Sequence, residues 1–284
     1  MSTRTADGDV AFDDRPSRHA VSPAIVVDAM ATQMRVLNAL ILRETKTRYG
    51  GYKIGFLWAL IEPAVSVSAF VMIFSLFRAD GPSGMPLIAF MLTGFVPFAL
   101  FRDPSNQMQG SISGSRMLLT FPQVTTFDVI LARGLLEVAV TLFTFGFLLW
   151  LASLLGYEVR IERPLGVLLG CFLLATLGIG AGFIFASLEP LVPSIKQFTA
   201  QVLGRPLYFS SGLFFTAESL PPQALHYLQY NPLLHMIELV RGEFFHSFET
   251  THGSWLYASA WSLGTLATGL VVHQAMRRRA VSTR

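Results

Sequence analysis

The segment Arg43–Phe77 reads RETKTRYGGYKIGFLWALIEPAVSVSAFVMIFSLF. Its second part, Ile54–Phe77, exceeds the ~20 mostly apolar residues that a helix needs to cross a membrane, and Glu62 is its one charge. Its first part, Arg43–Lys53, is basic, and lysine and arginine gather on the cytoplasmic side of membrane helices. The stretch therefore predicts a membrane helix that starts in the cytoplasm. Its basic part either only orients that helix or also handles a cargo that passes the membrane.

The composition of the whole chain agrees with a protein of many membrane helices. Of its 284 residues, 52% are hydrophobic and 14% are charged, against about 25% charged residues in soluble domains. The mean hydropathy is +0.51. The single cysteine, Cys171, lies in an apolar run and excludes an intramolecular disulfide. The six histidines form no pair with the spacing of a metal motif, so we expect no metal site.

Further apolar segments predict an all-α polytopic membrane protein with six crossings. The expected crossings are Ile54–Phe77, Met85–Phe101, Val129–Leu155, Leu165–Leu188, Phe198–Phe215 and Trp255–Met276. An even number of crossings puts both termini on one side of the membrane. With the termini inside, the cytoplasmic segments hold all of the 21 lysines and arginines except Arg78, Arg160, Arg163 and Arg241. We therefore expect both termini in the cytoplasm.

The N-terminal region divides into a tail and a surface helix. Residues 1–22 are polar and lack the apolar core of a signal peptide, which predicts a disordered cytoplasmic tail. Residues 23–48 predict an amphipathic helix along the membrane surface, with Ser22 as N-cap and Pro23 in the first turn. The six-helix membrane domain then occupies residues 49–284.

Two segments outside the crossings carry apolar patches. Asn231–Phe245 predicts a short extracytoplasmic helix capped by Asn231, in which Glu238 and Arg241 can pair. On the cytoplasmic side, the patch Met117–Phe121 precedes Pro122. That patch is either an interfacial loop or a docking knob for a soluble partner.

Charged and helix-breaking residues within the crossings are the candidate functional positions. Glu62 precedes a proline, so it marks either a kink or a cavity. Arg133 and Glu137 stand four residues apart and predict an intrahelical pair. The stretch GRPLYFSSGLFF, Gly204–Phe215, combines a charge, a proline and aromatic residues, which favours pore lining over a kinked packing helix.

Glycine motifs in the chain favour packing over nucleotide binding. There is no P-loop motif, so the chain has no phosphate cradle of that type. GIGAG lies within an expected crossing and lacks the last glycine of a dinucleotide motif. We interpret Gly178 with Gly182, and Gly166 with Gly170, as faces for close helix packing.

Ordered motifs carry a resemblance to a known family. In chain order they are LILRETKTRYGGYKIGFLWALIEP, FMLTGFVPFALFR, LLTFPQV, ARGLLEV, RPLYFSSGLFF, LPPQALHYLQYNPLLHMIELVRGEFF and the basic MRRR. Together they resemble the permease subunits of bacterial type-2 ABC exporters, above all the capsular-polysaccharide (KpsM-like) branch. The resemblance runs in the same order from about residue 30 to about residue 280.

The resemblance implies an architecture and a set of partners. It implies six transmembrane helices, a cytoplasmic interface helix, a re-entrant extracytoplasmic hairpin at about residues 219–246, and a homodimer with the channel between protomers. Two cytoplasmic ABC ATPase subunits would bind ATP and Mg, so this chain holds no cofactor and is no enzyme itself. A coupling helix at about residues 111–122 would enter the ATPase. Its residues are Ser111, Ser115, Arg116, Met117, Leu118, Leu119, Phe121 and Pro122.

The resemblance also implies a cargo and a place in the cell. The protein would lie in the bacterial inner membrane and export a lipid-linked acidic capsule chain toward a periplasmic adaptor or co-polymerase and an outer-membrane export protein, without nucleic acid. Several weak basic sites and aromatic rings suit a sliding anionic polymer. The residues expected along its path are Arg43, Lys46, Arg48, Lys53, Trp58, Glu62, Arg205, Tyr208, Phe209, Phe214 and Phe215.

Other functions remain open at this point. A permease for O-antigen or teichoic acid would use the same machine, and an exporter of drugs or lipids is more distant. A lipid-linked sugar transferase would need an acidic, metal-binding or nucleophilic cluster at the membrane face. The cytoplasmic acids Glu44, Asp103, Asp128 and Glu189 are dispersed in the sequence, and we expect them to be unpaired. A pure anchor protein would not explain the interrupted fifth segment.

Overall fold

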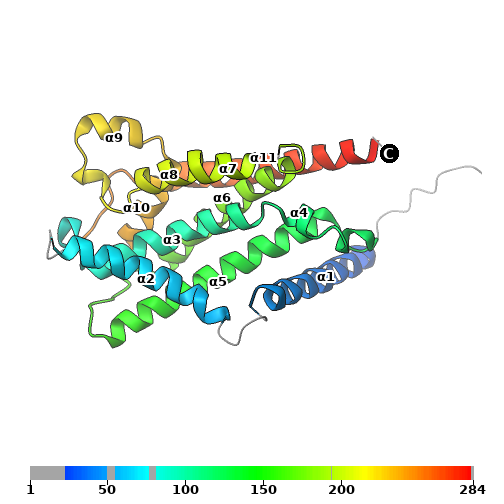
Figure 1. Cartoon of the computed structure of the whole chain (residues 1–284). Coiled ribbons are helices and arrows are strands. Elements are labelled where there is room, and N and C mark those ends of the chain that lie inside the picture. Colours follow the sequence, from blue (N-terminus) through cyan, green and yellow to red (C-terminus); the bar gives the residue numbers. More distant parts are fainter. Residues whose placement is uncertain (1–22, 50–54, 77–80, 193, 283–284) are drawn as a thin grey trace, which may run out of the picture. The chain divides into compact units, whose positions relative to one another are not determined.

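The computed structural model describes residues 23–49, 55–76, 81–192 and 194–282, and all regular elements in these ranges are helical (Figure 1). The chain divides after Arg35 into two units. The first unit is described only as the beginning of α1 (Pro23–Tyr49), where Arg35 Nε donates a hydrogen bond to the Ala31 carbonyl. The second unit holds the rest of α1 and all other elements. The predicted tail, the N-cap Ser22 and the path residue Lys53 lie outside the described residues.

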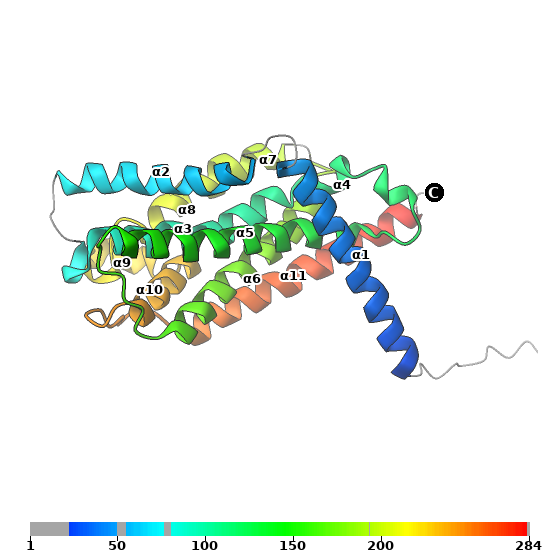
Figure 2. The ribbon, with the colours of Figure 1, turned by 90° about the horizontal axis from the view of Figure 1, so that it is seen from below.

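Among the described residues, five helices are long and apolar enough to cross a membrane. They are α2 (Gly55–Ser75), α3 (Leu87–Gln107), α5 (Thr126–Leu154), α6 (Pro164–Leu188) and α11 (Trp255–Ser282), which run alongside one another in Figure 2. Each of them matches a predicted crossing. The helix α3 continues to Gln107, beyond the predicted end at Phe101.

The predicted fifth crossing, Phe198–Phe215, is not one uniform helix. It consists of α7 (Ile195–Phe198), the π-helical turn η3 (Thr199–Gly204) and α8 (Arg205–Ser210), followed by irregular chain. A π-helical turn carries an extra residue and often marks a functional site. The segment is helical only as far as Ser210, and it is not among the five long apolar helices.

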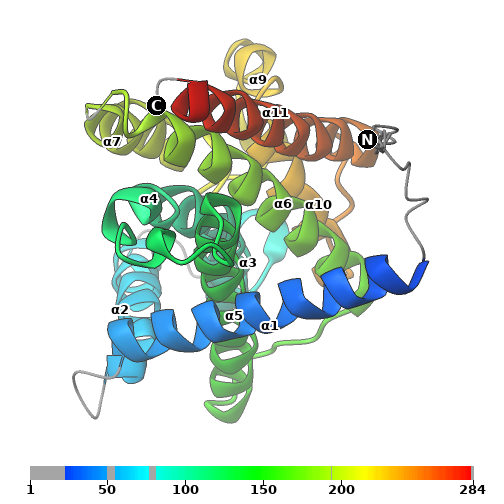
Figure 3. The same ribbon diagram turned by 90° about the vertical axis from the view of Figure 1, so that its right-hand side faces the viewer.

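Short helices gather at the two ends of the long helices. At one end lie α4 (Ser111–Gly114) and η2 (Leu118–Thr120). Figure 3 turns this end toward the viewer, with α4 labelled. At the other end lie η1 (Pro82–Gly84), η4 (Ala217–Ser219), α9 (Pro222–Leu228) and α10 (Pro232–Phe244). The Asn231 side chain accepts a hydrogen bond from the Leu233 amide at 3.0 Å, which confirms the predicted cap of α10.

Glycines of α6 allow its neighbours to approach closely. Gly166 and Gly170 face α10, and a Cβ on Gly170 would lie 2.6 Å from a Val240 methyl group. A Cβ on Gly178 would lie 2.7 Å from backbone oxygens of α3, and Gly182 faces Met108 just after α3. The predicted packing role of these glycines is confirmed.

A buried arginine of α10 holds the irregular chain after α8. Arg241 is fully buried, and its Nη1 donates to the carbonyls of Gly212 at 2.5 Å and Phe215 at 3.2 Å. Its Nη2 donates to the carbonyls of Leu213 at 3.2 Å and Phe90 at 3.4 Å. A backbone without its own hydrogen bonds is tolerated at such depth only when protein groups satisfy it. Arg241 supplies those donors.

The sequence-based pairing of Arg241 with Glu238 is wrong in its choice of partners. Glu238 instead accepts hydrogen bonds from the Ala217 amide at 3.0 Å and the Thr250 hydroxyl at 3.2 Å. Arg241 reaches the chain after α8, whereas Glu238 reaches η4 and the segment between α10 and α11. The three-residue spacing of Glu238 and Arg241 allows a pair within α10. Buried backbone amides and carbonyls need partners as well, and they bind these two charged side chains instead.

Candidate functional site

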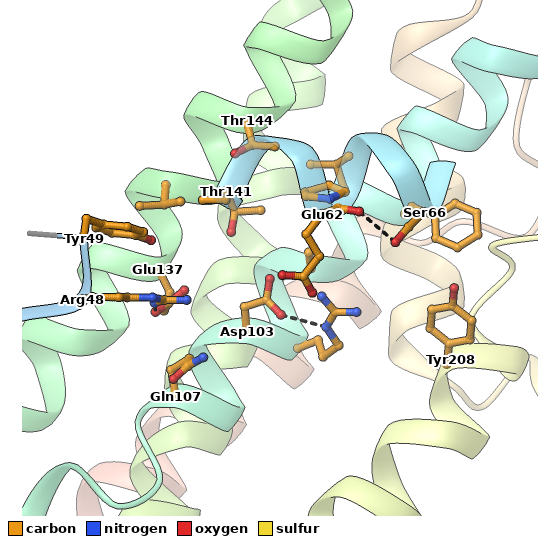
Figure 4. A pocket seen from close by; sticks show the side chains of 17 residues that line it. Arg48, Tyr49, Glu62, Ser66, Asp103, Gln107, Glu137, Thr141, Thr144 and Tyr208 are labelled. Carbon is orange, nitrogen blue, oxygen red and sulfur yellow. Dashed lines mark hydrogen bonds and ion pairs between the residues drawn. The ribbon is translucent and has the colours of Figure 1, made fainter. Parts of the chain in front are cut away.

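A cavity of about 170 Å³ lies between α2, α3, α5 and α8, with the end of α1 at its rim (Figure 4). Its lining side chains come from elements far apart in the sequence, so only the packing of the helices creates it. The polar lining residues are Arg48, Tyr49, Glu62, Ser66, Arg102, Asp103, Gln107, Glu137, Thr141, Thr144 and Tyr208.

The charges of this cavity are largely paired with one another. Arg48 at the end of α1 forms an ion pair with Glu137 of α5, and Arg102 Nε lies 2.7 Å from Asp103 Oδ1 on α3. Glu62 of α2 points toward Asp103 in Figure 4. Three carboxylates therefore stand against two guanidinium groups. The lining offers donors and acceptors together, which suits a ligand rich in hydroxyl groups better than a bare anion.

The end of α1 is tied to α5 by two parallel ion pairs. Arg48 pairs with Glu137, and Glu44 Oε1 lies 2.8 Å from Arg133 Nε. The prediction that Arg133 and Glu137 pair within their own helix is wrong. Both side chains lie on the face of α5 that meets α1, where partners from another helix reach them.

Neutral polar groups complete the lining. The Ser66 hydroxyl donates to the Glu62 carbonyl at 2.9 Å. Thr144 is 2% exposed, and its hydroxyl has no hydrogen-bond partner among the described residues. Burial raises the pKa of the Tyr49 phenol; the Arg48 charge lowers it and the Asp103 charge raises it, with burial the largest effect. Tyr49 therefore stays neutral at physiological pH.

An aromatic cluster adjoins the cavity where α8 meets α2 and α3. Tyr208 contacts Phe95 at 5.8 Å and Phe214 at 5.7 Å between ring centroids. Phe214 also stacks on Phe209 at 5.9 Å, and Phe209 is 64% exposed. Edge and stacked geometries of this kind are favourable for aromatic pairs. The cluster presents ring faces next to the polar cavity.

The structure brings some of the predicted path residues together and leaves others apart. Arg48, Glu62 and Tyr208 line the cavity, and Phe209 and Phe214 belong to the adjoining rings. The remaining described ones lie outside the cavity: Arg43, Lys46, Trp58 and Arg205 are exposed, and Phe215 is half-buried.

Sequence reasoning missed several lining residues. Arg102, Asp103, Thr141 and Thr144 belong to the cavity, yet no local motif marks them. The one available signal was a pair of adjacent opposite charges, Arg102 and Asp103, at the end of an apolar segment. Such a pair of charges indicates where a membrane helix ends, but it does not indicate that the two side chains face a cavity.

The expected coupling segment has both buried and exposed members. Ser111 and Ser115 are buried, whereas Met117 is 86% exposed and Phe121 is 61% exposed. Leu118 and Leu119 are half-buried, Arg116 and Pro122 are exposed, and the two leucines pack against Leu37, Leu40, Val129 and Ala132. The full predicted set therefore cannot form one contact surface. Ser111 and Ser115 are corrected to internal positions, because their side chains are shielded from solvent within this chain.

The acidic residues that would serve an enzyme have structural partners. Glu44 pairs with Arg133, Asp103 with Arg102, and Glu189 with Lys196 at 3.2 Å. The fourth, Asp128, forms a capping box at the start of α5. The expectation that these acids are unpaired is wrong, and their engagement disfavours a catalytic acid cluster. In the described part of the chain, no group of three or more His, Cys, Asp and Glu side chains is placed to hold a metal ion.

Comparison with known proteins decides the family. Residues 35–245 match the ABC-2 type transporter family, which is more than half of the chain. The chain belongs to the ABC-2 type transporter family. The matched range of this ABC-2 permease contains the cavity, the aromatic cluster and the segment from α4 to η2.

Several curated relatives resemble this ABC-2 permease over most of its length. The polysialic acid transport protein KpsM of Escherichia coli is 31% identical over 242 residues, which cover 85% of this chain and 93% of KpsM. The capsule polysaccharide export inner-membrane protein CtrC of Neisseria meningitidis serogroup A is 33% identical, with 87% and 92% covered. BexB of Haemophilus influenzae, with the same description, is 34% identical, with 86% and 92% covered.

Proposed function

We propose that this chain is the inner-membrane permease subunit of an ATP-driven exporter that moves capsular polysaccharide from the cytoplasm to the periplasm. The relatives named above, at 31–34% identity over most of the chain, support the capsule as cargo. The structural observation that carries the proposal is the polar cavity beside exposed aromatic rings on an interrupted helix. Paired charges and ring faces suit weak, repeated contacts with a sugar chain.

The proposed topology has six crossings with both termini in the cytoplasm. The run α7–η3–α8 serves as the fifth crossing, because it leads from the end where α4 lies toward the end where α9 lies (Figure 1). The segment from α9 to α10 then forms the re-entrant extracytoplasmic hairpin. The distribution of lysine and arginine supports this orientation.

The proposed exporter contains further subunits. Two copies of this chain form the channel, and two cytoplasmic ABC ATPase subunits bind ATP and Mg. Met117 and Phe121 dock on the ATPase, because they are large apolar side chains exposed at the end where α4 lies. A periplasmic adaptor and an outer-membrane export protein continue the path.

The basic end of α1 acts in this proposal as the cytoplasmic lip of the path. Arg43 and Lys46 are exposed and attract an acidic, lipid-linked chain, whereas Arg48 already pairs with Glu137. Arg43→Ala combined with Lys46→Ala is expected to lower export of an acidic capsule in a correctly inserted protein. Arg43→Ala combined with Arg48→Ala tests the lip and the ion pair together. Unchanged capsule export in both double variants would refute the proposal that the basic end of α1 binds the cargo.

Deletion of the gene in its host tests the function itself. We expect capsular polysaccharide to disappear from the cell surface and to accumulate in the cytoplasm, with recovery on re-expression. Purification of the tagged chain is expected to yield a soluble ATPase in the same complex. A normal surface capsule after deletion, together with purification free of any ATPase, would refute the proposal.

A further inference from the structure

A polar bracket joins the turn before α4 to the π-helical turn η3. The Thr199 hydroxyl of η3 donates a hydrogen bond to Gln109 Oε1 at 3.1 Å, across 90 positions of sequence. Both residues are buried, with Gln109 7% and Thr199 4% exposed. The Gln109 amide in turn donates to the Ser105 carbonyl in α3 at 3.0 Å. The turn after α3 is thus bonded directly to η3.

A second connection runs through the residues between α6 and η3. Lys196 of α7 lies 3.2 Å from Glu189, and the Ser113 hydroxyl of α4 donates to Glu189 Oε1 at 3.4 Å. The ammonium group of Lys196 also lies against Gly110, where a Cβ would come within 2.7 Å of it. Gly110 has a φ of 71°, in the left-handed region that favours glycine. This backbone conformation and the close Lys196 side chain both explain why a glycine stands at this position. Lys196 is 51% exposed, so this ion pair is the weaker connection.

The helix α8, which follows η3 in the chain, carries an aromatic residue that lines the cavity. Tyr208 of α8 lines the cavity and contacts Phe95 and Phe98 of α3, with centroid distances of 5.8 Å and 5.7 Å. In an α-helix, one residue corresponds to about 100° of rotation, since a turn has 3.6 residues. A π-helical turn that takes up or releases its extra residue therefore turns every following side chain by about that angle.

We propose that Gln109, Thr199, Glu189 and Lys196 are positioning residues that transmit movement of α4 to η3 and so to Tyr208. This inference rests on the proposed function, in which the ATPase docks on Met117 and Phe121, the residues on either side of η2. Movement of the docked ATPase then shifts η2 and the adjoining α4. The buried Gln109–Thr199 hydrogen bond is the main link and the Glu189–Lys196 ion pair supports it. The bracket makes the aromatic side of the cavity follow the ATPase cycle.

The first test separates ATP hydrolysis from export. The wild-type complex and each variant complex are purified with their ATPase in lipid nanodiscs, and the rate of ATP hydrolysis is measured. Export is measured separately, as surface capsule per cell, in a host that lacks its own copy of the gene and expresses the wild type or the variant. Gln109→Met keeps the volume of the side chain and leaves the Thr199 hydroxyl its second acceptor, the Lys196 carbonyl at 3.1 Å. Gln109→Met removes the bond from Thr199 and also the bond from the Gln109 amide to the Ser105 carbonyl within the same segment, but only the first of these joins the turn after α3 to η3. We expect capsule exported per ATP hydrolysed to fall about threefold to tenfold, as for the loss of that one linking hydrogen bond. Hydrolysis and the amount of folded complex stay within about twofold.

Further variants distinguish transmission from stability. Thr199→Val is expected to act like Gln109→Met, and the double variant is expected to be no worse than the stronger single one. Thr176→Val is the matched control, because that hydroxyl is buried and, in the part of the chain that the structure describes, bonds only the Phe172 carbonyl of its own helix at 2.8 Å. This control should leave export per ATP unchanged.

The ion pair is tested by exchange of its charges. Glu189→Lys and Lys196→Glu are each expected to lower export per ATP, and the combined exchange is expected to restore it. Unchanged export per ATP in both Gln109→Met and Thr199→Val would overturn the proposal, as would a fall of export strictly in parallel with folded complex. A wild-type complex that lacks an ATPase or exports no capsule would instead refute the proposed function.

Discussion

Replacement of Arg241 by methionine tests how the irregular chain after α8 is held. The guanidinium group donates to the carbonyls of Gly212, Leu213, Phe215 and Phe90, at distances from 2.5 to 3.4 Å. It also lies 3.8 Å from the centre of the Phe90 ring. Methionine has a similar length but no donor, so all four carbonyls lose this partner.

The expected cost follows from the balance of these bonds and the burial of the charge. Hydrogen bonds to a charged donor contribute about 1.5–3 kcal/mol each, but burying the guanidinium group costs several kcal/mol. Methionine leaves buried carbonyls without this donor, at about 1–3 kcal/mol for each one that stays unsatisfied. Because removal of the buried charge offsets part of this cost, we expect a net loss of about 3–5 kcal/mol. We expect Arg241→Met to lower the Tm by on the order of 10 °C. Arg241→Lys keeps the positive charge but loses the planar guanidinium group with its several N–H donors. Its Tm should therefore lie between those of the wild type and Arg241→Met.

The assay is thermal unfolding of the purified protein in detergent, followed by tryptophan fluorescence. Arg160→Met is the matched control, because Arg160 is exposed outside the long helices. Its Tm should equal that of the wild type. If Arg241→Met unfolded within about 2 °C of the wild type, the four hydrogen bonds would not hold this chain and the reasoning would be refuted.

Three further predictions concern packing, docking and the α1–α5 contact. Gly178→Val should leave little folded protein in size-exclusion chromatography, because its side chain would meet backbone oxygens of α3 at 2.7 Å. Met117→Asp combined with Phe121→Asp should lower copurified ATPase about tenfold without loss of folded protein, since both side chains are exposed. Arg48→Gln should lower the free energy of unfolding by about 2–3 kcal/mol, because it leaves the carboxylate of Glu137 buried without this partner. Glu137→Gln should cost only about 1 kcal/mol, because the freed arginine is partly exposed.

Each of these predictions has a control and a contradicting result. Gly146→Val faces open space and should fold, so equal loss of both glycine variants would contradict the packing argument. Tyr227 of α9, at the opposite end, is 77% exposed, between Met117 at 86% and Phe121 at 61%. Tyr227→Asp should leave the ATPase bound, and an equal loss of ATPase in this variant would contradict the docking site. If Arg48→Gln lowered the free energy of unfolding no more than Glu137→Gln does, the buried Glu137 carboxylate would not depend on its ion pair with Arg48.

Most membrane helices could be predicted because their signals are local. An apolar segment such as Ile54–Phe77 must be long enough to cross, and this requirement is independent of its neighbours. The cap Asn231 and the start of α1 at Pro23 are likewise set within a few residues. The interruption of Phe198–Phe215 was marked by its arginine, proline and glycines, although the π-helical turn η3 was not foreseen.

The partners of the charged residues could not be predicted in the same way. Arg133 and Glu137 suit an intrahelical pair by spacing, but α1 offers each a different partner, so the pairs form between helices. Ser111 and Ser115 looked available for docking, yet both are buried. Local spacing states which contacts are possible, and the competing neighbours decide which of them form.

Apolar length and ordered motifs are properties of the linear chain, so they already identify a polytopic membrane protein, the positions of its long helices and the family that it resembles. The cavity, the role of Arg241 and the bracket between Gln109 and Thr199 arise only from the folded arrangement of the helices. These features join residues far apart in the sequence. They exist because buried polar groups must find partners, and packing determines which groups are within reach.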